Sequence, residues 1–379
     1  MELAFYTGKW RVSSAASPVV RTKRLLPKHM QQEPSVFIII LNWNGLHDTL
    51  ECLESIAKLN YQNRRVIVVD NGSVDASTTE IKAAHPDIIL FENKTNLGYT
   101  GGNNLGLRYA LENGADYAWL LNNDTIVDRE CLSRLIAAAE QHRDIGLISP
   151  IIYQYYESDR IQFCGTLVDW RTDKLVAVKT PLVFQDEILA ANLMLWGTAL
   201  LVKSSMVRQI GYLDERYFAY HEDIDYSMRA IEAGFRTFLE PTAVVYHKTS
   251  RSLGAHSPIV RYFMWRNIYL LWMTRLQGWK KYSYPARYLA LVLASAVRYK
   301  VEGMDSTASG CLEGAWSAIR GHFGPRRDGS ETRVALKKIL RIFSWHPHFW
   351  IALFEGHFRR ILFEGARRMS LRVRQYSGL

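Results

Sequence analysis

Asn122, Asn123 and Asp124 are the residues whose types and position most directly suggest chemistry. They follow an apolar run at 117–121 that is typical of a strand, so they would lie at the carboxyl end of a buried strand, where open α/β sheets bind ligands. One carboxylate flanked by amides can hold a hard divalent cation, Mg²⁺ or Mn²⁺, beside a diphosphate, with the amides contacting sugar or ribose hydroxyls. The alternative is an ordinary turn, because Asn and Asp are common turn formers.

A second polar cluster opens a predicted helix. Glu222, Asp223 and Asp225 stand at its start, ahead of apolar residues with helical spacing. A carboxylate that faces a site can deprotonate an acceptor hydroxyl as general base, although acidic residues at a helix start also interact favourably with the helix dipole. His247 follows a short strand predicted at 243–246, where its ring could give a nitrogen to a metal; a histidine of this kind is more often structural.

Two further features follow predicted strands. The Asp70 carboxylate could accept a hydrogen bond from a uracil or thymine imide or from ribose; the alternative is a cap for the helix that opens near Asp75. The glycine-rich segment 96–104 (NLGYTGGNN) would let backbone approach a ligand and would present amides at a helix start, suiting a phosphate or sugar. A dehydrogenase would place GxGxxG directly after the first strand, where this chain has NWNG at 42–45, so a dinucleotide oxidoreductase is disfavoured.

The elements that must position these residues alternate between strand and helix. Continuous apolar, β-branched runs predict strands buried on both faces. Such alternation predicts βαβ crossovers and a mainly parallel sheet covered by helices on both faces, an α/β fold. The predicted strands are 36–41, 65–69, 88–91, 117–121, 146–149 and 198–203, and the predicted helices are 46–58, 76–84, 105–112, 132–141 and 204–210. Residues 35–150 form the expected nucleotide-binding half, and residues 151–255, with hairpins at 151–195, the expected acceptor half.

Charge and aromatic residues set the rest of the chain apart. Residues 325–379 hold twelve Lys and Arg against four Asp and Glu, within a net charge of +10 for 379 residues. From 256 onward Trp, Tyr and Leu interleave with Arg and Lys, which is typical of helices lying in a membrane interface; the alternative is helices packed on the catalytic domain with solvated charges. We expect a helical membrane-proximal region at 256–324 and a basic amphipathic tail at 325–379. The longest apolar stretch, 288–297, is too short to span a bilayer.

Composition excludes several other classes. The four cysteines are scattered and form no CxxC pair, which disfavours a zinc site and a disulfide scaffold and fits a reducing cytoplasm. Residues 1–34 lack periodicity and an apolar core, so a poorly ordered arm and no secretory signal are expected. No base-reading module accompanies the positive charge, so nucleic acid is not expected as a partner.

Residues 36 to about 325 resemble the family 2 glycosyltransferases of GT-A fold, in particular their rhamnosyltransferase-like branch in bacterial polysaccharide synthesis. The order and spacing of the motifs are far more specific than any one of them. The motifs are NWNG (42–45), VDNGSVD (69–75), NLGYTGGNN (96–104), LLNNDT (120–125), WGTALLV (196–202), YFAYHEDIDYSMR (217–229) and YHKTS (246–250).

The resemblance implies a role for each matching position. Asp70 would lie at the nucleotide base, and Asp124 with His247 would hold the metal. The segment 122–124 replaces the DxD motif, with an amide in place of its first carboxylate. Asp223 would be the catalytic base. The acceptor side would include Trp196, Gly197, Thr198 and Glu222, and the donor side Asn42, Asn44, Asp70, Asn71, Gly72, Asn96, Gly98, Gly101, Asn104, Asn122 and Asn123.

The implied activity is inverting transfer from a nucleotide sugar, with dTDP-L-rhamnose as the favoured donor. The acceptor would be a saccharide or a polyprenyl-linked saccharide, with the protein bound peripherally at the inner face of the plasma membrane. Alternatives are the same fold with UDP-galactose, UDP-N-acetylglucosamine or UDP-galactofuranose, or a non-catalytic nucleotide-sugar-binding protein at the membrane.

Overall fold

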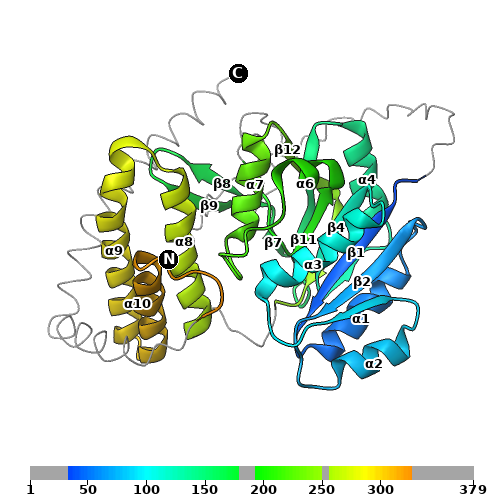
Figure 1. Ribbon diagram of the computed structural model, residues 1–379, viewed down its shortest axis with the longest axis horizontal. Coiled ribbons are helices and arrows are strands. Elements are labelled where there is room, and N and C mark those ends of the chain that lie inside the picture. The colour runs from blue at the N-terminus through cyan, green and yellow to red at the C-terminus, as the bar shows by residue number, and fades with distance from the viewer. Residues whose placement is uncertain (1–32, 179–192, 250–255, 327–379) are drawn as a thin grey trace.

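A nine-stranded sheet forms the centre of the protein, with strand order β3-β2-β1-β4-β11-β6-β12-β5 and β7 paired to β6 (Figure 1). The computed structural model describes residues 33–178, 193–249 and 256–326. The arm predicted at 1–34 and the tail predicted at 325–379 therefore lie almost wholly outside the described residues. The fold is a mixed α/β arrangement in which the parallel strands come first in the chain.

The first half contains the predicted parallel strands. Strands β1 and β2 pair in parallel, as do β1 with β4 and β2 with β3. The predicted alternation of strands and helices is confirmed, with most boundaries within one or two residues. The elements are β1 (Val36–Asn42), α1 (Leu46–Ala57), β2 (Arg64–Asp70), α2 (Ser77–Ala84), β3 (Ile89–Glu92), α3 (Gly98–Glu112) and β4 (Tyr117–Asn122).

Helix α3 begins at Gly98, seven residues before the expected start, so most of the glycine-rich segment is helical. Its glycines allow close packing on β1. A Cβ at Gly102 would lie 2.3 Å from Leu41 Cδ1, and one at Gly106 would lie 2.6 Å from Ile39 Cγ2. The expected helix start at Leu105 is thus wrong, whereas the amides of the segment do lie at a helix start, at Gly98. Gly102 and Gly106 serve helix–sheet packing.

The second half adds strands of both directions. Strand β11 is antiparallel to β4 and β6, β12 is parallel to β6, and β5 closes the edge antiparallel to β12. Strand β12 is far longer than the short strand predicted, because a register shift between Glu240 and Val244 absorbs Pro241. The elements are β5 (Thr125–Val127), α4 (Cys131–Gln141), β6 (Ile145–Gln154), β11 (Ala199–Lys203), α6 (Ser204–Ile210), α7 (Glu222–Glu232) and β12 (Arg236–His247).

The hairpins expected at 151–195 are present in the described part of that segment. Strand β7 pairs antiparallel with β6, and a separate three-stranded sheet has the order β10-β8-β9. Residues 179–192 lie outside the described residues. The strands are β7 (Ile161–Phe163), β8 (Gly165–Asp169), β9 (Lys174–Val178) and β10 (Leu193–Met194).

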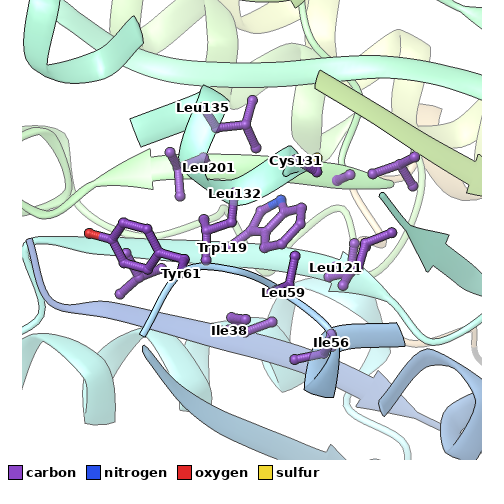
Figure 2. Packing of buried hydrophobic residues seen from close by; sticks show 14 of the residues in the cluster. Ile38, Ile56, Leu59, Tyr61, Trp119, Leu121, Cys131, Leu132, Leu135 and Leu201 are labelled. Atoms are coloured by element: carbon purple, nitrogen blue, oxygen red, sulfur yellow. The ribbon is translucent and has the colours of Figure 1, made fainter. Parts of the chain in front are cut away.

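The large sheet has a hydrophobic core on each face. Along β1, Ile38 and Ile40 pack into a cluster with α1 and α4, whereas Phe37 and Ile39 pack into a cluster with α3, α6 and α7. Figure 2 shows the first cluster, centred on the fully buried Trp119 of β4. This burial on both faces is why the strand sequences are continuously apolar.

Three helices form a layer beside the sheet at the opposite end of the molecule from α2 (Figure 1): α8 (Pro258–Arg275), α9 (Gly278–Val301) and α10 (Asp305–Ile319). Their core includes Trp272 and Tyr288 together with Tyr217, Ile224 and Met228 of the segment 151–255. For these aromatic residues the membrane-facing prediction is wrong, and the alternative of packing against the catalytic domain describes them. Within the described parts of the chain, we find no helix that combines the length and apolar character needed to cross a membrane.

Candidate active site

The carboxyl ends of β1 and β2 carry a hydrogen-bonded cluster around Asp70. Parallel register places Asn42 beside Asp70, and Asn42 Nδ2 donates to Asp70 Oδ1 at 2.7 Å. Ser73 donates to Oδ1 from its hydroxyl at 2.6 Å and to Oδ2 from its backbone at 2.9 Å. Each carboxylate oxygen can accept about two hydrogen bonds, so Oδ2 retains the capacity to accept one more donor. Asn44 extends the cluster by donating its backbone N–H to Ser73 Oγ at 2.8 Å.

Asn71 and its neighbours form the loop beside this cluster. Asn71 Nδ2 donates to Asn96 Oδ1 and to Gly98 O, both at 3.0 Å, and Leu97 N donates to Asn71 Oδ1 at 3.0 Å. Gly72 has φ +77°, and a Cβ there would lie 2.9 Å from backbone of the neighbouring loop. The predicted donor residues Asn71, Gly72, Asn96 and Gly98 therefore lie together, and their visible role is to shape this loop.

A hydrogen-bonded path joins the end of β4 to this cluster. Asn123 Nδ2 donates to Thr49 Oγ1 at 3.0 Å, and Thr49 Oγ1 donates to Asn42 Oδ1 at 2.8 Å. Thr49 was not predicted; its position in the first turn of the helix after NWNG is the signal that could have found it. The side chains that follow three neighbouring strands thus act as one polar network.

Asp124 and His247 meet because β5 and β12 pair antiparallel, with His247 opposite Thr125. The distance from Asp124 Oδ1 to His247 Nε2 is 3.1 Å, and the two side chains are 5% and 12% exposed. His247 Nδ1 lies 2.9 Å from Gln162 Oε1. In the tautomer with the proton on Nδ1, the ring would donate to this oxygen and keep Nε2 unprotonated, so that Nε2 could bind a cation together with Asp124. A carboxylate oxygen and an imidazole nitrogen oriented in this way fit a divalent cation.

A second group of possible metal ligands lies nearby on α1, formed by His47, Asp48 and Glu51 with their ligand atoms within 4.8 Å of one another. Lys248, which follows His247, places its Nζ 2.7 Å from Asp48 Oδ1 and also binds Glu51. The bond to Lys248 lowers the pKa of Glu51. The ammonium thus already supplies a cation to this group, which leaves Asp124 and His247 as the better candidates.

The three acidic residues at the start of α7 have different environments. Asp225 forms ion pairs with Arg229 at 2.8 Å and with Arg275 at 2.7 Å, so its role is structural. Burial raises the pKa of Asp223 to about 6, although this side chain remains partly exposed. Burial and the neighbouring Asp223 raise the pKa of Glu222 well above its usual value, and Glu222 Oε2 has no hydrogen-bond partner among the described residues.

A short turn connects Asp223 to the end of β4. Gly197 N donates to Asp223 Oδ2 at 2.9 Å, and the carbonyl of the adjacent Thr198 accepts from Asn122 N at 2.9 Å. Tyr99, which was not predicted, donates to Gly197 O at 2.6 Å, and a Cβ at Gly197 would lie 2.5 Å from the Tyr99 hydroxyl. Residues 197 and 198 thus link the predicted base to the end of β4, where Asn122 lies.

Family models match this chain over the elements that build the site. A model described as "Glycosyl transferase family 2" matches residues 35–186, and one described as "Glycosyl transferase family group 2" matches residues 119–353, which is more than half of the chain. The chain belongs to the family 2 glycosyltransferases.

Curated relatives agree with this family. The Haloferax volcanii "Low-salt glycan biosynthesis hexosyltransferase Agl10" is 28% identical over 201 residues, 51% of this chain and 60% of the relative. The Shigella flexneri "dTDP-rhamnosyl transferase RfbF" is 23% identical over 248 residues, 62% of this chain and 79% of the relative. The Mycobacterium tuberculosis "Galactofuranosyltransferase GlfT1" is 28% identical over 204 residues, 53% of this chain and 66% of the relative. Two of these matches thus span only about three-fifths to two-thirds of the relative's length.

A solved structure described as GalNAc-T7 with UDP, GalNAc and Mn²⁺ resembles the chain with a TM-score of 0.54 and 15% identity, over 77% of this chain and 58% of that one. At this identity the likeness shows the fold alone. The predicted GT-A fold is confirmed.

Three predicted residues of this glycosyltransferase take part in packing. Asn104 is 1% exposed; its Nδ2 donates to Leu213 O at 2.9 Å and its Oδ1 accepts from Leu213 N at 3.0 Å. Gly101 lies within α3. Trp196 stacks on Phe163 with ring centroids 3.7 Å apart and donates to a threonine hydroxyl. For Asn104 and Gly101 a donor contact would need a change in packing, so we leave them out of the donor site proposed below.

Proposed function

We propose that the protein is an inverting glycosyltransferase that moves a sugar from a nucleoside diphosphate donor to a hydroxyl of a saccharide or lipid-linked saccharide. The observation that supports this most is the link from Asn122 through Thr198 and Gly197 to Asp223. It joins a carboxylate of raised pKa to the strand ends that carry Asp124 and His247. A general base close to residues that would bind the diphosphate suits the transfer of a sugar to a hydroxyl group.

Asp223 is the proposed general base. With a pKa near 6 it is ionised at neutral pH, yet basic enough to accept a proton in the transition state. Backbone N–H groups of Gly197 and Ile224 fix its two oxygens at 2.9 Å and 2.7 Å, leaving lone pairs on both. It takes the acceptor proton as the acceptor oxygen bonds to the anomeric carbon, and the electron pair of the breaking bond leaves with the nucleoside diphosphate. Attack opposite the leaving group inverts the anomeric centre.

Asp124 and His247 are the proposed holders of a divalent cation, Mg²⁺ or Mn²⁺. When bound, such an ion stabilises the negative charge of the departing diphosphate as a Lewis acid. The amide of Asn122 at the first position of the DxD-like segment gives this site one negative charge fewer than two carboxylates would. We therefore expect binding of the ion to depend strongly on His247 and on the diphosphate itself.

Asp70 is the proposed contact to the nucleobase. Its Oδ2 keeps the capacity for another hydrogen bond while Asn42 and Ser73 hold the carboxylate in place. The imide N–H of thymine or uracil could donate a hydrogen bond to Asp70 Oδ2, which supports a dTDP-sugar or a UDP-sugar as the substrate.

The donor that we favour is dTDP-L-rhamnose. RfbF is named a dTDP-rhamnosyl transferase, and another relative, 26% identical over 235 residues, is named "N-acetylglucosaminyl-diphospho-decaprenol L-rhamnosyltransferase". GlfT1 is named a galactofuranosyltransferase, which keeps UDP-galactofuranose and UDP-hexoses as alternatives. The lipid-linked substrate in the second name supports a polyprenyl-linked acceptor.

A panel assay tests the function and the donor together. The protein is incubated with dTDP-rhamnose, UDP-sugars or GDP-sugars, with and without Mg²⁺ or Mn²⁺, and release of the nucleotide is measured. We expect release from dTDP-rhamnose above all others, and only with the ion. Tight nucleotide binding without release from any donor, across a range of saccharide acceptors, would instead support a non-catalytic nucleotide-sugar-binding protein.

We also propose peripheral binding to the inner face of the plasma membrane, supported by the outer side of α9 and by the basic tail. Trp279 and Tyr282 are 81% and 80% exposed one turn apart, with the exposed Lys281 between them. Exposed aromatic residues next to cationic ones suit an anionic lipid interface. Sedimentation with anionic vesicles tests this: Trp279→Ser with Tyr282→Ser, or truncation at Pro325, should reduce the bound fraction, and unchanged binding in both would contradict it.

A further inference from the structure

The turn that leads into α7 has an unfavourable backbone conformation. Phe218, Tyr220 and His221 have φ values of +64°, +71° and +70°. Residues with side chains rarely adopt this left-handed region, and they persist in it only where surrounding contacts hold them there. His221 is the N-cap of α7, immediately before Glu222 and Asp223. The conformation of the turn therefore sets the position at which α7 begins, and with it the position of Asp223 in the first turn of that helix.

Asn267 of α8 binds this turn. Its side chain is fully buried, and Nδ2 lies 2.9, 2.7 and 2.7 Å from the carbonyl oxygens of Tyr217, Ala219 and Tyr220. Three carbonyls that converge on one amide nitrogen require the backbone to fold around it. Without that donor the partly buried carbonyl oxygens of Ala219 and Tyr220 would lose this hydrogen bond, which is unfavourable.

Arg266, the preceding residue, fixes Asn267 and binds the same turn. Its Nε donates to Asn267 Oδ1 at 2.9 Å, which orients the amide with Nδ2 toward the carbonyls. Its Nη2 donates to Tyr217 O at 2.7 Å and Arg216 O at 3.2 Å. A fully buried guanidinium is unfavourable unless its N–H groups are hydrogen-bonded, and main-chain carbonyls at the start of the turn supply those bonds.

Two contacts of Phe218, one with α3 and one with α8, complete the enclosure of the turn. Phe218 O accepts from Thr100 N of α3 at 3.1 Å, and the Phe218 ring stacks on Phe263 of α8 with centroids 5.2 Å apart. A Cβ at Gly98 would lie 2.4 Å from Phe218 O, so the approach of α3 also requires glycine there. The turn is thus held between the donor-side helix α3 and the C-terminal helix α8.

We propose that Arg266 and Asn267 are positioning residues for the base. From α8 they hold the turn 217–221, which is left-handed at Phe218, Tyr220 and His221, in the conformation that sets the start of α7 and the placement of Asp223. The proposal rests on the proposed function in that Asp223 is the base. It gives the C-terminal helices a part in catalysis, although they contribute no proposed contact to the reacting groups.

The test uses two conservative variants of the full chain. Asn267→Asp keeps the size of the side chain but faces the three carbonyls with oxygen, and Arg266→Lys keeps the charge but cannot bond the turn and Asn267 together. Since misplacement by about 1 Å can cost on the order of 100-fold in rate, we expect kcat to fall about 10- to 100-fold for Asn267→Asp and less for Arg266→Lys. The KM for dTDP-rhamnose and the affinity for dTDP should stay within about two-fold.

Tyr288→Phe is the matched control. It removes a buried hydrogen bond of 2.8 Å from Tyr288 of α9 to Trp265 O of α8, the helix that carries Arg266 and Asn267. The variant does not change any contact to the turn. It should lower the melting temperature and leave kcat unchanged. If Asn267→Asp and Arg266→Lys also lower only the melting temperature, their role is structural and the proposal is overturned.

Hydrogen exchange gives a readout that needs no substrate. The amides of residues 217–225 should exchange faster in Asn267→Asp than in Tyr288→Phe at matched stability. Unchanged exchange there overturns the proposal, even if the protein releases nucleotide as proposed. If wild-type protein releases no nucleotide from any donor, the proposed function fails, and the exchange rates still show whether the two residues hold the turn.

Discussion

The donor side and the base side of the site are built in different ways. On the donor side, Asn42, Asp70 and Asn123 follow neighbouring strands, and they bond to one another or through Thr49. On the proposed base side, Asp223 accepts a hydrogen bond from Gly197 N, and Asn267 of α8 donates to the turn that precedes α7. In the function proposed above, donor binding would depend on the edge of the sheet, whereas placement of the base would depend on segments far apart in the chain. Substitutions on the donor side should therefore mainly weaken nucleotide binding, and substitutions on the base side should mainly lower kcat.

Asp223→Asn should have the largest effect. It removes the proton acceptor but keeps the size of the side chain, and general base catalysis contributes about 10²- to 10⁴-fold. We expect kcat to fall by that amount with dTDP affinity nearly intact. Glu232→Gln, on the same helix near its end, is the control and should keep normal turnover. Wild-type turnover in Asp223→Asn would break the comparison, because the base would then lie elsewhere.

Asp70→Asn tests the donor side. A hydrogen bond to a charged group contributes about 1.5–3 kcal/mol, so loss of the carboxylate should weaken binding of dTDP or UDP about 10- to 100-fold. The kcat at saturating donor should change little. Calorimetric titration with the nucleotide measures the first effect and steady-state kinetics the second. A fall in kcat with unchanged affinity would mean that the two sides are not separable.

Gln162→Leu tests the orientation of the metal histidine. Gln162 Oε1 lies 2.9 Å from His247 Nδ1, and loss of such a partner usually costs about 10- to 100-fold in metal affinity. We expect a loss of Mn²⁺ affinity near the lower end of this range, about 10-fold, measured as a higher Kd for Mn²⁺ in the presence of dTDP. Gln209→Leu, on the surface helix α6, is the control. Equal Mn²⁺ affinity in Gln162→Leu and wild type would show that His247 does not need this contact.

The pH profile should give a smaller effect on the base side. Burial raises the pKa of Asp223 to about 6, and the base acts in its ionised form. The value of kcat/KM should thus be nearly full from about pH 7 upward, be halved near pH 6, and be lower by about ten-fold one unit below that pKa. Nucleotide affinity measured over the same range separates this loss from weaker binding. If kcat/KM instead fell only near pH 4, the pKa of Asp223 would not be raised, which would mean that water solvates its carboxylate.

Much of the donor side could be predicted from the sequence. A strand buried on both faces is continuously apolar, so polar residues such as Asn42, Asp70 and Asn122 mark its carboxyl end. Parallel pairing then places these ends at one edge. The helix at 222–232 was legible from spacing, although the sequence did not show that Asp225 would be engaged by Arg229 and Arg275.

Other features required the tertiary structure. From the sequence, the glycine-rich segment that opens α3 suggests contact with a ligand. Only the structure shows that Gly102 and Gly106 pack against Leu41 and Ile39 of β1. The aromatic residues of α8 and α9 have the composition of an interfacial helix, and only packing decided that Trp272 and Tyr288 are core residues.

The sequence by itself determined the sheet, the family and the polar residues at its edge, because alternation and burial act over a few neighbouring positions. Only the tertiary structure showed that Asp225 is engaged by two arginines, whereas Asp223 accepts hydrogen bonds from backbone N–H groups. Two of the hydrogen bonds at this site join Asp223 to Gly197 and the turn before α7 to Asn267, 26 and about 50 residues apart in the chain. Contacts of that separation leave no local periodicity, since they form only when distant elements pack together.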